Sequence, residues 1–348
     1  MVLRTALGGI IMDENKHSFG EIFLAVIKNR ILPFLLPASV PNIGIVLLGA
    51  FSLSYLIQWG WTELAPDKLF YDKSSLIGYS IITLVRLLAL LLVYVLVTEH
   101  YHVEDHHTWG RNPGLGVFFM SFLVGVPAYL LSCSSHNLFI FAELKMENPI
   151  PSQLYYYVTT ENTIYSTLLL LVIGCILPVL IEELFFRGLV YSVLPDKWWI
   201  RIPLPALIST LFAMNRLEFI PFLIIGLCAS AVRYYSDSTL CSILARICMY
   251  CMSILFSSIL PYQEPDLVQN AIDYNRTTLY ASVIGFVLGI VMMIVLLKQL
   301  VYVKYRIKNE DISCHSEEGR PIAIPLRDHF HIDFFLGVAF LVLCWVLY

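Results

Sequence analysis

Charged residues are scarce in this sequence. Only 14% of its 348 residues are Asp, Glu, Lys or Arg, whereas 58% are apolar and the mean hydropathy is +0.74. A single water-soluble core could not bury so much apolar surface, so lipid must be part of the solvent around the chain. The formal net charge of -4 is also small, and nothing in it suggests a nucleic-acid partner.

Several other features are absent. Residues 1–20 contain no long apolar stretch, so we expect no cleaved secretory signal. No internal repeat or low-complexity segment is visible, and the chain does not divide into two similar halves as a transporter with inverted repeats often does. No polar loop has the composition of an independent domain. We therefore expect residues 1–348 to form one membrane domain.

Apolar runs of helical length fill most of the chain. They predict an all-α fold, a polytopic transmembrane helical bundle of about eight or nine spans. Residues 21–36 carry charges opposite an apolar face, which predicts either a short interfacial helix or an extension of the first span. The expected spans cover residues 42–59, 75–98, 115–133, 164–194, 202–215, 217–235, 239–260, 279–301 and 333–348.

Lys and Arg are distributed unequally between the two sides of this bundle. When the spans alternate in direction, most of these residues fall in loops on the side of the N-terminus. Loops rich in Lys and Arg stay in the cytoplasm. We therefore expect a multi-pass protein of the plasma (inner) membrane with a cytoplasmic N-terminus.

Away from the ends of the expected spans, five charged residues lie inside them: Arg86, Glu182, Glu183, Arg187 and Arg246. Charge at this depth marks a functional site by default, although pairing that only holds helices together is the alternative. Glu183 and Arg187 are four residues apart and share a helix face, whereas Glu182 lies about 100 degrees around the axis. We expect Arg187 to pair with Glu183 and Glu182 to be available for chemistry. Arg86 either pairs with one of the glutamates or snorkels to an interface.

The sequence around these glutamates matches a known pattern. The run Glu-Glu-x-x-x-Arg, followed by Gly188, resembles the first motif of the CPBP family of CAAX prenyl proteases and bacteriocin-processing membrane proteins. Residues 211–216 resemble the family's Phe-x-x-x-His helix, and residues 221–246 resemble its closing helix pair. The resemblance implies a CPBP-like core at about residues 160–260. The flanking regions, 1–159 and 261–348, match only as generic membrane helices and loops.

The resemblance implies an intramembrane endopeptidase. In the family, the first glutamate of the pair and two motif histidines are taken to activate the water that attacks a peptide bond. Carried over to this chain, Glu182 is the candidate general base, with Glu183 and Arg187 in support. The implied partners are membrane lipid and a peptide or lipidated protein substrate.

Both expected histidines are replaced. Anchored on Phe212, the second motif has Arg216 at the histidine position, and the third motif has Arg246. No histidine lies between residues 137 and 314. Arginine stays protonated, so it can neither accept a proton nor bind a metal, although it could donate to an oxyanion. With both glutamates and Arg187, the two arginines give a net positive cluster that suits an anion or a fixed ion-pair network.

Metal binding is not expected elsewhere either. His100, His102, His106 and His107 have ligand types that suit zinc, but loop histidines beside carboxylates are more commonly solvated. The family zinc is not expected because both motif histidines are missing. The cysteines inside apolar runs are interpreted as small core residues.

Two functions therefore stay open. The first is a CPBP-type intramembrane endopeptidase, with catalysis weakened by the two arginines. The second is a proteolytically inactive family member that binds a peptide, a lipid head group or a partner protein in the charged cavity. A transporter or channel ranks last because only intramembrane charge supports it. The sequence does not indicate an oligomeric state.

Overall fold

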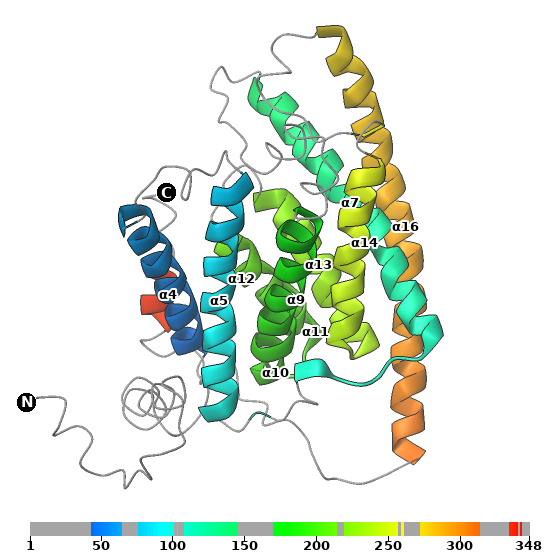
Figure 1. Ribbon diagram of the computed structural model, residues 1–348. Helices are drawn as coiled ribbons and strands as arrows, with labels where there is room; N and C mark the ends of the chain where they lie inside the picture. Colours follow the sequence, from blue (N-terminus) through cyan, green and yellow to red (C-terminus); the bar gives the residue numbers. More distant parts are fainter. Residues whose placement is uncertain are drawn as a thin grey trace, which may run out of the picture.

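The described residues are almost entirely helical in the computed structural model of the chain (Figure 1). Within the described residues the only β-type pairing is an isolated bridge between Gly110 and Ser238, so the predicted all-α membrane bundle is confirmed. The structure describes residues 43–64, 76–100, 103, 108–144, 170–213, 219–256, 259–260, 272–313, 334–339 and 342. The expected interfacial helix at 21–36 lies outside these residues, as does most of the last expected span.

Long helices flank a central one. The helices are α4 (Ile43–Leu64), α5 (Leu76–His100), α7 (Leu115–Leu144), α11 (Trp198–Arg201), α12 (Pro203–Ala213), α13 (Phe219–Ser236), α14 (Thr239–Leu255) and α16 (Ile272–Ser313). Four stretches of the described helices are long and apolar enough to cross a membrane: Ser80–His100, Leu115–Ala142, Phe219–Ser236 and Arg276–Tyr305. They make the chain an integral membrane protein. The expected spans at 202–215 and 239–260 are present as shorter apolar helices.

The expected span at 164–194 contains two π-helical segments. It consists of η3 (Leu170–Ile176), α9 (Leu177–Glu183), η4 (Leu184–Val190) and α10 (Tyr191–Val193), which follow one another without a break. We call residues 170–193 the central helix. π-helical turns are rare and often occur at functional sites.

Two apolar cores lie on either side of the central helix, and only the first contains residues of that helix. The first joins it to α4, α5 and α12 through residues such as Phe51, Leu90 and Phe212. The second joins α7, α13, α14 and α16. In Figure 1, α4 and α5 lie on one side of the central helix, and α14, α7 and α16 lie on the other. The acidic pair of the central helix is therefore placed between the two cores.

Two helices are longer than the sequence predicts. Helix α7 continues to Leu144, and α16 continues to Ser313, into stretches that were expected to be polar loops from 134 and 302. At least one polar side chain in the added part of α7 is satisfied by a neighbouring helix. Asn137 donates a hydrogen bond from Nδ2 to Ser282 Oγ on α16, at 3.1 Å. Interhelical hydrogen bonds of this kind stabilise helices in lipid.

Helices α7 and α14 approach each other closely at Gly125. A Cβ atom there would lie 2.6 Å from Cys248 Cβ and would also clash with the carbonyl oxygen of Ala245. Small residues at helix interfaces allow this kind of packing in membranes. Gly116, on the same helix, is exposed and has open space around its Cα hydrogens.

We expect Gly125→Ala to lower the free energy of unfolding by about 1–3 kcal/mol, because the added methyl group overpacks the interface. Gly116→Ala is the matched control, and it should be neutral or slightly stabilising because alanine favours a helix. Denaturant titration in mixed micelles measures both. Equal stability of the two variants would show that the close approach at Gly125 is wrong.

Candidate functional site

The acidic pair lies where the central helix changes its winding. Glu182 and Glu183 end the α-helical part, α9, and Arg187 lies in the π-helical segment η4. Glu183 and Arg187 are completely or almost completely buried. Their ion pair joins Arg187 Nη1 to Glu183 Oε1 at 3.1 Å, which confirms the pairing expected from the four-residue spacing.

Arg187 also fixes two neighbouring helices. Its Nη2 donates to Ser209 Oγ of α12 at 3.1 Å and to the carbonyl oxygen of Gly226 of α13 at 3.0 Å. Its Nε donates to Ser230 Oγ, also of α13, at 3.3 Å. A side chain at Gly226 would press on Ala206 of α12. The small residues thus let both helices come close enough to satisfy a buried guanidinium group.

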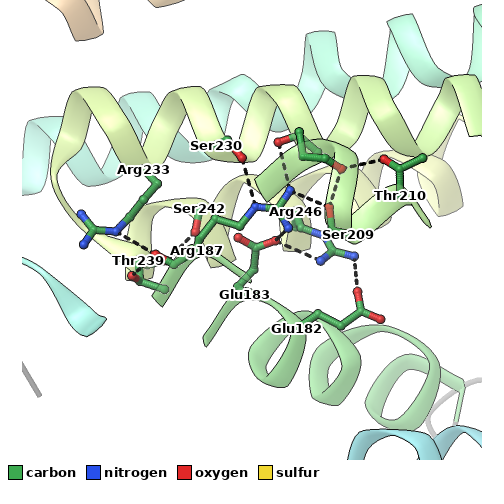
Figure 2. A network of polar contacts seen from close by, with 12 residues as sticks. Glu182, Glu183, Arg187, Ser209, Thr210, Ser230, Arg233, Thr239, Ser242 and Arg246 are labelled. Carbon is green, nitrogen blue, oxygen red and sulfur yellow. Dashed lines mark hydrogen bonds and ion pairs between the residues drawn. The ribbon is translucent and has the colours of Figure 1, made fainter. Parts of the chain in front are cut away.

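Arg246 of α14 bridges both glutamates. Its Nη1 lies 2.9 Å from Glu183 Oε1, and its Nη2 lies 2.9 Å from Glu182 Oε2. Figure 2 shows the two contacts as dashed lines from one guanidinium group. The expectation that Glu182 would be left available is therefore wrong. The two carboxylates point in different directions, yet the fork of the guanidinium group is wide enough to reach both.

Arg86 of α5 contacts the opposite edge of Glu182. Its Nη2 lies 3.5 Å from Glu182 Oε1, and its guanidinium carbon lies 4.4 Å from the centre of the Phe212 ring. Of the two interpretations of Arg86, pairing with a glutamate is therefore the one the structure supports. Arg86 is a member of the site that the motif comparison did not include, and its position in the middle of an apolar span was the signal.

Phe212 itself packs in the first apolar core. Its ring centre lies 5.0 Å from that of Phe51 and 5.6 Å from that of Phe186. The guanidinium group of Arg86 thus lies over a flat aromatic ring that is itself packed in the core. Arg216, the other substituted motif position, lies outside the described residues.

The described site does not fit a zinc ion. Its two carboxylates are contacted by three guanidinium groups, which repel a divalent cation, and it contains no histidine among the residues described above. The described parts of the chain contain no group of three His, Cys, Asp or Glu side chains that could hold a metal.

A second polar network closes the C-terminal end of the central helix. Arg233 Nε donates to the carbonyl oxygen of Arg187 at 3.2 Å, and Arg233 Nη1 pairs with Asp237 at 2.9 Å. Thr239 Oγ1 donates to the carbonyl oxygen of Thr108. A Cβ atom at Gly188 would lie 3.3 Å from that same oxygen. Gly188 therefore lets the segment at Thr108, which lies outside the motifs, pack against the site.

Sequence reasoning missed the serines and threonines of these networks. Ser209, Ser230 and Thr239 give no local signal because small polar residues are common in membrane helices. They become recognisable as site residues only when the helices are placed side by side.

We expect Arg187→Gln to lower the free energy of unfolding by about 3–5 kcal/mol, because it leaves a buried carboxylate with one partner fewer. Asp196→Asn is the control: its pair with Arg201, at 3.1 Å, involves an aspartate that is 68% exposed. An exposed pair contributes less than about 1 kcal/mol. Denaturant titration in mixed micelles compares the variants, and similar losses for both would contradict the buried network.

One family model matches the chain. It is described as Type II CAAX prenyl endopeptidase Rce1-like, and it covers residues 164–252. The match includes both glutamates, Arg187 and Arg246 but does not reach Arg86. The chain matches no curated protein and no solved structure.

Proposed function

Since residues 164–252 form an Rce1-like domain in an integral membrane protein, we propose that this chain keeps the fold of an intramembrane CAAX-type endopeptidase and binds a ligand at the charged site without hydrolysing it. The endopeptidase activity belongs to the family description. The absence of hydrolysis is our inference from the chemistry of the side chains at the site.

The bridge made by Arg246 is the observation that carries this proposal. A general base must approach a water molecule and accept its proton. Here one guanidinium group holds one oxygen of each carboxylate at 2.9 Å, and Arg86 lies 3.5 Å from the other oxygen of Glu182. A base at Glu182 would therefore have to work between two cations, while the remaining oxygen, Glu183 Oε2, is buried. Arginine cannot take over the task, because it remains protonated in proteins.

The same arrangement favours binding. Three guanidinium groups and two carboxylates leave the described cluster with a net positive charge. Buried charge of one sign attracts a group of the other. A peptide, a lipid head group or a partner protein could supply that group. Our proposal places the ligand in the membrane, because the site is built from helices that cross it or pack within it.

Peptide-bond hydrolysis is the competing function, and two observations favour it. The family match covers the acidic pair, and the side chain of Glu182 is 17% exposed, so water has a route to it. In this alternative Glu182 is the base, Glu183 and Arg187 support it, and Arg246 donates to the oxyanion. A ligand would first have to draw Arg246 away from Glu182.

We also propose a location and orientation. The excess of Lys and Arg on the side of the N-terminus favours a cytoplasmic N-terminus in a plasma (inner) membrane. Peptides or lipidated proteins that reach the site would then come from membrane lipid or the cytoplasmic face.

We expect the purified full-length chain, reconstituted in lipid vesicles, to release no product from prenylated CAAX peptides or from unmodified peptides of the same sequences. Mass spectrometry of the peptides measures turnover, and Glu182→Gln is the matched variant. An active type II CAAX endopeptidase treated in parallel controls for peptide quality. Turnover by the wild type that Glu182→Gln abolishes would overturn the proposal.

Arg246→His provides a second test of the same idea. It restores an imidazole at the third-motif position and frees Glu182 from one cation. We expect this single change to lower stability, because Glu183 loses a buried partner, and to give no hydrolysis while Arg216 is unchanged. The double variant Arg216→His with Arg246→His is the one expected to regain turnover. Turnover by the wild type as fast as by the double variant would show that neither arginine impairs catalysis.

A further inference from the structure

Arg86 differs from the other arginines of the site in its exposure. Its side chain is 31% exposed, whereas that of Arg246 is 6% exposed and that of Arg187 is 1% exposed. Glu182, its partner, is 17% exposed. The cluster is therefore closed on the side of Arg187 and accessible on the side of Arg86. A ligand that reaches the charged groups meets Arg86 first.

The contacts of Arg86 leave its hydrogen-bonding capacity unused. Within the described residues it makes a 3.5 Å ion pair with Glu182, which is not a hydrogen bond, and it lies over the Phe212 ring. A guanidinium group carries five N–H donors in a planar fork. In addition, Arg246 Nε is buried and has no hydrogen-bond partner among the described residues. Buried or lipid-facing donors without acceptors are costly.

Other arginines near the central helix have their own carboxylates. Arg201 pairs with Asp196 at 3.1 Å, and Arg233 pairs with Asp237 at 2.9 Å. Arg86 shares its carboxylate with Arg246, which holds it at the shorter distance. Arg86 is thus the guanidinium group whose charge is least compensated in the described cluster.

The surroundings of Arg86 are apolar. It lies in the middle of a helix that is long and apolar enough to cross a membrane. Leu88, two residues further along this helix and on the opposite face from Arg86, is 61% exposed, so α5 borders lipid on that face. A hydrated inorganic ion would lose its water on entering such a place. A molecule with an anionic group on an apolar chain could instead contact Arg86 through the anion while its apolar chain stays in lipid.

We propose that the ligand of the site is an anionic amphiphile, with a phosphate or carboxylate group on an apolar chain, and that Arg86 is its anchoring residue. The guanidinium fork matches the paired oxygens of either group. The anion neutralises the net positive charge of the cluster and accepts hydrogen bonds from the N–H groups of Arg86. This inference rests on the proposed function, since it names the ligand that is bound without being hydrolysed.

The test uses the full-length chain in neutral detergent micelles. Four probes are added separately: dodecyl phosphate, dodecanoate, inorganic phosphate and zwitterionic dodecylphosphocholine. The shift in thermal unfolding temperature with probe concentration gives each Kd. We expect dodecyl phosphate or dodecanoate to bind at least about tenfold more tightly than the other two, because only they combine a bare anion with an apolar chain. The difference between these two probes identifies the phosphate or the carboxylate as the preferred group.

Arg86→Gln is the variant that decides the proposal, and Arg276→Gln is its control. Arg276 is exposed on α16 and belongs to another helix, so its loss changes the net charge equally without touching the site. We expect Arg86→Gln to weaken binding of the preferred probe by about tenfold or more, the loss typical of a charge-assisted contact. Arg86→Lys, which keeps the charge but not the fork, should lie between wild type and Arg86→Gln.

Stability without a probe separates anchoring from a structural role. Arg86→Gln removes the uncompensated charge and a long ion pair, so we expect its unfolding temperature to stay close to that of the wild type. A large fall would mean that Arg86 mainly holds helices together, and Arg86→Lys then carries the binding comparison. Equal binding by wild type and either Arg86 variant, or no tight probe for the wild type, would overturn the inference. Glu182-dependent hydrolysis would instead overturn the proposed function, and the two failures are measured separately.

Discussion

A single guanidinium group, that of Arg246, holds the carboxylates of two adjacent residues, and the arrangement of the site depends on it. Charges inside a lipid bilayer are expensive unless they are paired. Two carboxylates side by side in a bilayer therefore need cations in contact with both. Arg246 of α14 contacts both carboxylates, and Arg187, within the central helix, adds a second contact to Glu183. The ion pairs thus join α14 to the central helix, and removing one partner would leave a buried charge uncompensated.

The packing of the two apolar cores makes this possible. One core lies on the side of α4 and α5, the other on the side of α7, α14 and α16, and the charged groups occupy their boundary. Small residues at that boundary, among them Gly226, Ser209 and Ser230, let the helices approach and provide acceptors for Arg187. Close helix packing in lipid depends on such residues because apolar burial provides no driving force there.

The sequence predicted those features that depend on spacing within one helix. Apolar run length predicted the all-α membrane bundle, and the spacing of four residues predicted the Glu183–Arg187 pair. The bridge by Arg246 was not predictable, because it joins residues 63 and 64 positions apart in the sequence and depends on how α14 lies against the central helix. The π-helical segments have no recognised sequence pattern. The length of α7 was missed because Asn137 finds its partner on α16, which local polarity cannot reveal.

The resemblance places histidine where this chain has arginine, and such an exchange changes two properties of a site together. Histidine can be neutral, and it then accepts a proton and adds no charge to the bilayer. Arginine at the same position is always charged, so it removes a proton acceptor and leaves the cluster with more cations than carboxylates. In water, counterions would neutralise the excess. In lipid, a molecule that carries both an anion and an apolar chain is suited to do so, so our two proposals, the loss of water activation and the binding of an anionic amphiphile, rest on the same electrostatic cause.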